Sequence, residues 1–153
     1  MEKNHWTGEA LIGPDQGVRF NRRVGRYVKS MFPFIPWKDH AYYLQAQGYW
    51  VLSNWFLCDL CADQNYADLA VNCTDGLLRT QRPEGFWDYP HSGWAGRIAT
   101  VEIVWAAMGL LQSYERTKNE AYLVGALKTY DFLITKIGFQ NCEVGLAINY
   151  FAD

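Results

Sequence analysis

Apolar and polar residues alternate with helical periods along most of the chain, after an irregular lead-in over residues 1 to 15. From about Asp15 to just before Pro33, apolar side chains recur on one helical face and basic side chains on another. This separation predicts a basic amphipathic helix. The apolar face holds Phe20, Val24, Tyr27, Val28 and Met31, and the basic stripe holds Arg19, Arg22, Arg23, Arg26 and Lys29.

Four longer helices are expected after it, of two alternating kinds. Residues 41–62 are apolar on every face, which predicts a helix buried on every side. Residues 66–80 carry one apolar stripe opposite polar side chains, which predicts a helix with one wet face. The same two kinds recur over 96–115 and 121–137. The pattern therefore predicts two helical hairpins, each with a buried and a half-exposed helix.

The two hairpins also resemble each other residue by residue. When the chain is shifted by 56 positions, Tyr66 falls on Tyr122 and Ala70 falls on Ala126. Repetition at a fixed period is typical of stacked or ring-like helical arrays. Because two hairpins make only part of a ring, we expect a homo-oligomer or a missing partner chain to cover the free edges. The expected single domain has three parts: a lead-in with the amphipathic helix (1–40), the first hairpin and loop (41–95) and the second hairpin and loop (96–153).

The loop after the first hairpin has the spacing Gln81-x-x-x-Gly85-x-Trp87. It resembles the Gln-to-Trp repeat motif of squalene and oxidosqualene cyclases, whose α/α barrels are shared with protein prenyltransferases and resemble several polysaccharide-processing toroids. The resemblance implies an all-α fold, in which helical-hairpin repeats form part of an α/α toroid. It also implies that Gln81 caps a neighbouring helix and that Trp87 packs over it, while Gly85 permits a turn that a β-carbon would strain.

The resemblance supports the fold more strongly than the activity. In the second hairpin, Ile137 stands where the motif has Gln. The acidic Asp-x-Asp-Asp run that protonates a cyclase substrate does not occur in this sequence, and the zinc ligands of the prenyltransferases are not recognisable. If the chain is an enzyme, we expect a hydrolase, a lyase or a cyclase-like protein with incomplete motifs.

The segment from Glu84 to Glu102 holds the densest group of chemically active side chains. Loops at one end of a helical ring converge on its cavity, where carboxylates and an imidazole can divide acid and base roles and aromatic rings can hold a ligand. The alternative is structural: the acids cap helix ends and the Trp residues join the hairpins. The catalytic candidates are Glu84, Asp88, His91 and Glu102, and the ligand-binding candidates are Trp87, Tyr89, Trp94 and Arg97.

Glu102 stands among apolar residues in the helix expected over 96–115. A buried carboxylate needs a partner or a raised pKa, and such groups gather at functional sites. We expect its partner to be Arg97 or a basic group of the N-terminal helix, and structural pairing is the alternative to a catalytic role.

Composition narrows the classes of partner. The net charge of −2 and the pI of about 5.9 give no reason to expect nucleic acid. No leader segment is recognisable, and the longest apolar run, Ile103 to Leu111, is too short to span a membrane, so we expect a cytoplasmic protein. The aromatic share of 16% suits either helix packing or a surface for sugars or isoprenoids.

Neither a metal nor another cofactor is expected. Cys58-x-x-Cys61 has the spacing of half a zinc site, but a second ligand pair at suitable spacing is missing, so buried free thiols are the simpler interpretation. The basic stripe suits phosphates, acidic sugars or anionic lipid, and the alternative is a solvated face that docks on the acidic first hairpin.

Two hypotheses for function remain open at this stage. In the first, a cavity lined by the aromatic and acidic loop residues binds or processes a carbohydrate or a polyprenyl-type ligand. In the second, the chain is a non-catalytic helical-repeat module for self-association or partner binding.

Overall fold

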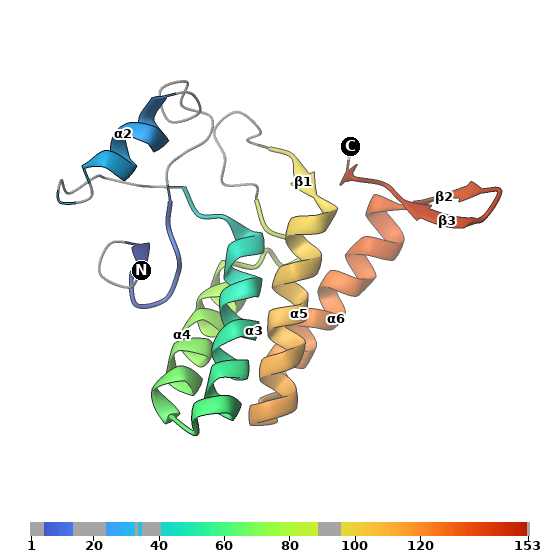
Figure 1. Ribbon diagram of the computed structural model, residues 1–153. Coiled ribbons are helices and arrows are strands. Elements are labelled where there is room, and N and C mark those ends of the chain that lie inside the picture. The colour runs from blue at the N-terminus through green and yellow to red at the C-terminus, as the bar shows by residue number, and fades with distance from the viewer. Residues whose placement is uncertain (1–4, 14–23, 33, 35–40, 89–95, 153) are drawn as a thin grey trace.

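The computed structural model describes residues 5–13, 24–32, 34, 41–88 and 96–152. Within these ranges the chain is mostly helical, with a few short antiparallel strands (Figure 1). Its elements are α2 (Arg26–Met31), α3 (Leu44–Cys61), α4 (Gln64–Thr80), β1 (Ile98–Ala99), α5 (Thr100–Thr117), α6 (Glu120–Phe132), the π-helical turn η3 (Leu133–Ile137), β2 (Phe139–Cys142), β3 (Gly145–Ile148) and β4 (Phe151–Ala152).

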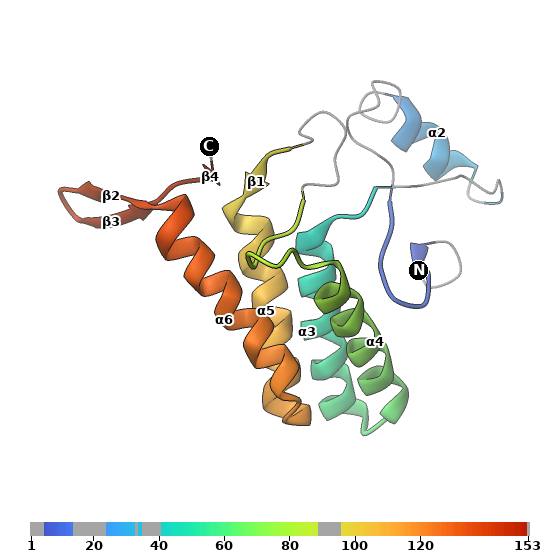
Figure 2. The same cartoon turned by 180° about the vertical axis from the view of Figure 1, so that it is seen from behind.

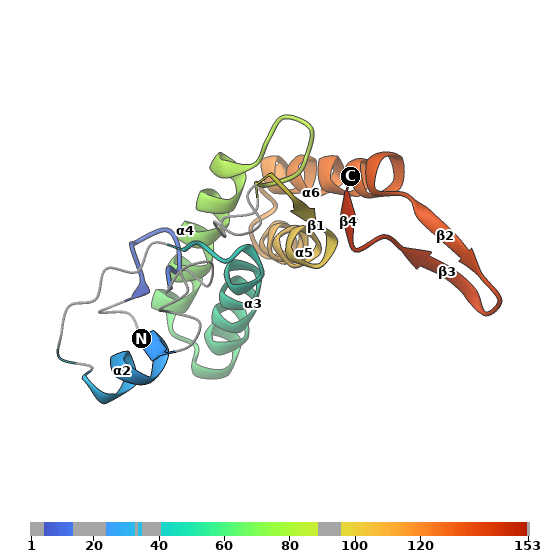
Figure 3. The same cartoon turned by 90° about the horizontal axis from the view of Figure 1, so that it is seen from above.

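The four long helices form two antiparallel hairpins arranged as two layers. Helix α3 packs against α4 and α5, and α5 packs against α6. Seen from behind, α4 and α6 lie in front of α3 and α5, and the view from above gives the same two layers (Figures 2 and 3). Helices α3 and α5 run in the same direction, because their contacts advance together along both, from Gln45 with Glu102 to Trp55 with Ser113.

The turns of the two hairpins have the same geometry, 56 positions apart. Helix α3 ends at Ala62 and helix α5 ends at Lys118, both in the left-handed region, with φ of 53° and 58°. The next residue in each case caps the following helix: Asp63 accepts a hydrogen bond from the Asn65 N–H, and Asn119 accepts one from the Ala121 N–H. A left-handed residue followed by an Asx cap both ends one helix and begins the next.

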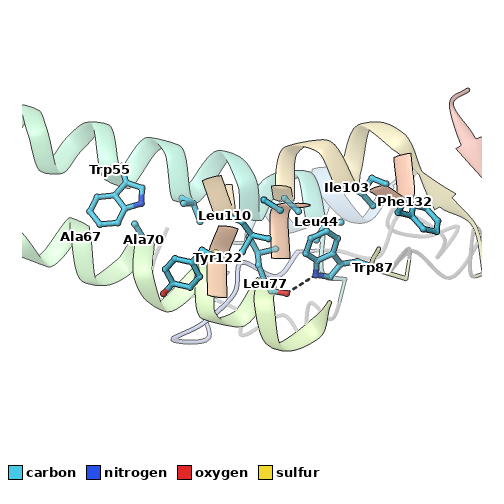
Figure 4. Packing of buried hydrophobic residues seen from close by; sticks show 14 of the residues in the cluster. Leu44, Trp55, Ala67, Ala70, Leu77, Trp87, Ile103, Leu110, Tyr122 and Phe132 are labelled. Carbon is cyan, nitrogen blue, oxygen red and sulfur yellow. Dashed lines mark hydrogen bonds between the residues drawn. The ribbon is translucent and has the colours of Figure 1, made fainter. Parts of the chain in front are cut away.

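The helices pack closely at glycine residues and around one buried series of hydrogen-bonded side chains. A β-carbon at Gly48 of α3 would lie 2.2 Å from the carbonyl oxygen of Trp105 in α5, so the two backbones touch there. The Trp55 indole donates to the Ser113 hydroxyl, which lies 2.6 Å from the Thr74 hydroxyl, and this chain of hydrogen bonds joins α3, α5 and α4. Apolar side chains from all four helices form the hydrophobic core (Figure 4).

The N-terminal segment is fastened to α3. Gln47, buried on α3, accepts a hydrogen bond from the Leu11 N–H and donates one to the Leu11 carbonyl, both at 2.7 Å. The predicted amphipathic helix is described only from residue 24, and α2 covers its last part. Arg19, Arg22 and Arg23 of the basic stripe lie outside the described residues.

Three details differ from the expectations. The strands were not predicted: β2 and β3 form a hairpin that extends away from the helices, and β4 pairs with β1, because the chain after Gly138 becomes extended instead of entering another helix (Figure 1). The helix expected from residue 96 begins at Thr100. Helices α3 and α5 are not buried on every side, since each exposes one apolar face.

In the part of the chain that the structure describes, no helix is long and apolar enough to cross a membrane.

Candidate functional site

The loop after α4, residues 81–88, clasps the second hairpin, and we call it the clasp loop. The side-chain amide of Gln81 donates hydrogen bonds of 2.9 Å to the Gly125 carbonyl and to the Thr129 hydroxyl, both on α6. The Thr129 hydroxyl in turn donates to the Gly85 carbonyl at 2.7 Å. Gln81 therefore fastens the loop to the middle of a neighbouring helix, and the expectation that it caps a helix end is wrong.

Gly85 brings the backbone of the clasp loop against the backbone of α6. Its φ is +98°, in the region that side chains avoid, and a β-carbon there would lie 2.3 Å from the Lys128 carbonyl oxygen. Both the turn and the contact exclude a side chain, as the motif predicted for the turn.

Trp87 caps the helix that precedes it. Its side chain is only 3% exposed, and its indole N–H donates a 2.8 Å hydrogen bond to the Leu77 carbonyl (Figure 4). Leu77 belongs to the last turn of α4, where carbonyls have no backbone N–H partner within the helix, and its carbonyl also accepts a 3.2 Å hydrogen bond from the Thr80 hydroxyl. The indole N–H therefore bonds the end of its own helix, while the packing of the ring over a neighbouring helix stays a prediction.

The two acids of the clasp loop face solvent. Asp88 is exposed and pairs with Arg82, whose Nε donates to the carboxylate at 2.9 Å. The hydrogen bond with Asp88 raises the pKa of Arg82. Glu84 is also exposed. Neither acid is buried in a place where a ligand would be shielded from water.

Two of the predicted site residues do line a pocket. Trp87 and Asp88 border a cavity of about 180 Å³ together with Tyr42 and Thr80, among the residues that the structure describes. Burial raises the pKa of the Tyr42 phenol, and a hydrogen bond with Thr80 partly offsets this effect. Tyr42 and Thr80 were not among the predicted site residues. Tyr42 precedes α3, and only the tertiary fold brings it to the end of α4.

Glu102 lies apart from that pocket lining and has a structural partner. Its buried carboxylate accepts a 2.6 Å hydrogen bond from the backbone N–H of Gln45, in the first turn of α3. Burial raises the pKa of Glu102, and this hydrogen bond partly offsets the shift. The expected pairing with Arg97 is wrong, since the Arg97 guanidinium lies over the Phe151 ring at 5.4 Å.

Three of the predicted site residues are not described by the structure. Tyr89, His91 and Trp94 lie outside the described residues. Within the described ranges, no three His, Cys, Asp or Glu side chains are grouped to hold a metal ion. The four cysteines are free thiols; Cys73 is buried, which raises the pKa of its thiol to about 12, while Cys61 and Cys142 are exposed.

A second surface, missed from the sequence, lies on the sides of α3 and α5 that face away from α4 and α6. We call it the inner face. On a helical wheel its exposed positions form one stripe on each helix, and the stripes adjoin where the rings of Tyr49 and Trp105 lie 4.3 Å apart. Its large exposed apolar residues are Tyr49, Phe56 and Leu60 of α3 and Val101, Met108 and Leu111 of α5.

Comparison with known proteins adds no family to this description. No protein-family model, curated protein or solved structure matches the chain.

Proposed function

We propose that this chain is a helical-hairpin binding module that docks an apolar surface of another molecule onto its inner face. One observation carries the proposal: α3 and α5 keep their inner faces apolar but leave them uncovered. Phe56 is 65% exposed and Leu60 is 69% exposed. Contiguous exposed apolar surface of this kind marks interaction sites in folded proteins.

The architecture supports an arc of an α/α toroid as the context of this face. The two inner helices run in parallel, each is followed by an antiparallel outer helix, and the same turn recurs 56 positions apart at Ala62 and Lys118. In the toroids that the Gln81-to-Trp87 motif resembles, the inner helices face the cavity. The inner face would then be the wall of an open ring.

The hydrogen bonds of the predicted catalytic residues favour binding over catalysis. The Glu102 carboxylate accepts from the Gln45 N–H, and Asp88 is paired with Arg82 in solvent. The polar groups of Gln81 and Trp87 hold backbone carbonyls of α6 and α4. Groups that are used in this way support the scaffold, and these four residues offer no acid and base aimed at a common point.

A second candidate function keeps the carbohydrate hypothesis and rests on the pocket of Tyr42, Thr80, Trp87 and Asp88. Hydroxyl and carboxylate groups beside an indole ring suit a hydroxylated ring compound, and the cavity of about 180 Å³ is large enough for one such ring. Titration of the ¹⁵N-labelled chain with monosaccharides tests it: shifts confined to this pocket and lost in Asp88→Asn support it, and unchanged spectra contradict it.

The binding module is tested with the fluorescent apolar probe bis-ANS, at a dilution where sedimentation shows the single chain. We expect the folded chain to bind the probe and Leu60→Gln to weaken that binding strongly. Leu127→Gln is the matched control, because Leu127 is a leucine of α6 with 51% exposure and lies off the inner face. Equal probe binding by the two variants, or none by the folded chain, would contradict the proposal.

A further inference from the structure

We infer that the molecule bound to the inner face is a second copy of this chain, related to the first by a two-fold axis. The inference rests on the proposed function and goes further by naming the partner. It follows from the size of the inner face, its charge, and a comparison with the other helical surfaces.

The inner face is just large enough for a specific interface between two copies. Helices α3 and α5 each have 18 residues, so each is about 27 Å long, and side by side they are about 20 Å wide. The face therefore presents roughly 540 Å² per copy, or roughly 1,100 Å² for two copies, and specific interfaces begin at about 1,000 Å² in total.

The charge of the face favours an identical partner. Among the exposed positions of α3 from Gln45 to Leu60 and of α5 from Val101 to Gln112, only Asp59, near the end of α3, carries a charge. The Glu102 carboxylate is turned to the Gln45 N–H, and the Asp59 and Arg116 charges at the far end pair with each other. A two-fold interface brings each patch against itself, so an uncharged patch meets no like charge there.

The other exposed helical surfaces are less suited to this role. The outer face of α4 is polar, with Asp68, Asn72 and Asp75. Helix α6 also exposes apolar residues, but Lys128 and Asp131 lie among them. Because charged residues are depleted in the centre of protein interfaces, the inner face is the better candidate of the three.

Sedimentation velocity over a concentration series tests the inference on the full chain. We expect a species of twice 17.7 kDa at micromolar concentration. In Leu60→Glu and in Met108→Glu the dissociation constant should rise at least about a hundredfold, since symmetry repeats each substitution and each unpaired carboxylate costs at least about tenfold. Leu127→Glu on α6 is the matched control and should leave association unchanged. Circular dichroism and thermal melting confirm that each variant is folded.

The outcomes test the identity of the partner separately from the existence of the binding face. Loss of the dimer in the two inner-face variants alone supports the second copy. A chain that stays monomeric at high concentration, but binds bis-ANS in a way that Leu60→Gln abolishes, overturns the second copy and leaves the binding face standing. A dimer that tolerates Leu60→Glu and Met108→Glu places the interface elsewhere and also overturns the inference.

Discussion

Glu102, in the first turn of α5, accepts a 2.6 Å hydrogen bond from the backbone N–H of Gln45, in the first turn of α3. The first N–H groups of a helix have no partner within it, and no side chain of α3 itself caps them at Tyr43. A residue 57 positions away thus closes the start of the neighbouring helix. The parallel helices α3 and α5 are aligned at this contact.

The pH dependence of stability should change when Glu102 can no longer ionise. Burial raises the pKa of Glu102 above its value in the unfolded chain, so the folded chain holds the carboxyl proton more tightly. The free energy of unfolding therefore falls as pH rises from the unfolded pKa to the folded pKa. Glu102→Gln stays neutral and keeps an acceptor for Gln45. We expect the variant to gain stability relative to the natural chain as pH rises from about 4.3 toward 7.

Urea unfolding of both chains at several pH values in this interval measures the effect. Glu102→Leu is the control that removes the acceptor, and it should cost about 1 to 3 kcal/mol. A natural chain that gains stability over Glu102→Gln with rising pH would show that the carboxylate is the favoured form in the fold.

The indole N–H of Trp87 should contribute measurably to stability. Trp87→Phe keeps an aromatic ring but removes the indole donor of the Leu77 carbonyl, which keeps only the 3.2 Å hydrogen bond from the Thr80 hydroxyl, so we expect a cost of about 0.5 to 1.5 kcal/mol in addition to the lost packing. Trp50→Phe is the matched control, because the buried N–H of Trp50 has no hydrogen-bond partner. Denaturant unfolding compares the two variants, and an equal loss in both would mean that the hydrogen bond of Trp87 adds nothing.

The close contact at Gly85 predicts a large effect for one methyl group. In Gly85→Ala the new β-carbon meets the Lys128 carbonyl, so we expect a loss of at least about 2 kcal/mol from strain and displacement of α6. Gly96 also has a positive φ, of +83°, but an added β-carbon there would meet nothing within 4 Å. Gly96→Ala should therefore cost only about 1 kcal/mol. Thermal unfolding compares the stability of the two variants, and similar losses of stability in both would contradict the close contact between Gly85 and α6.

The β2–β3 hairpin should be among the least protected parts of the chain. Every residue of both strands is exposed, and a two-stranded hairpin is only marginally stable by itself. We expect the amides of Gln140 to Ala147 to exchange with deuterium far sooner than those around Leu110, which is fully buried in α5. Mass spectrometry of peptic fragments measures this, and slow exchange of the hairpin would reveal a surface that covers it in solution.

The sequence predicted part of the clasp loop, and the reason lies in the range of each interaction. A positive φ is a local property, so Gly85 was readable from its motif. The partners of Gln81 and Glu102 are set by how whole helices pack, and each differs from its expected partner. Glu84 and Asp88 lie exposed beside the clasp, and the roles predicted for Tyr89, His91 and Trp94 remain predictions.

By itself the sequence determined the four long helices, the two hairpins and the polar outer surface of α4, because helical periodicity depends on side chains only three or four positions apart. It could not determine that the inner face of α3 and α5 stays uncovered, since an apolar residue looks the same in sequence whether or not another element packs on it. Tertiary structure alone decided which apolar stripes meet. It joined the Glu102 carboxylate to the Gln45 N–H and left Phe56 and Leu60 facing outward.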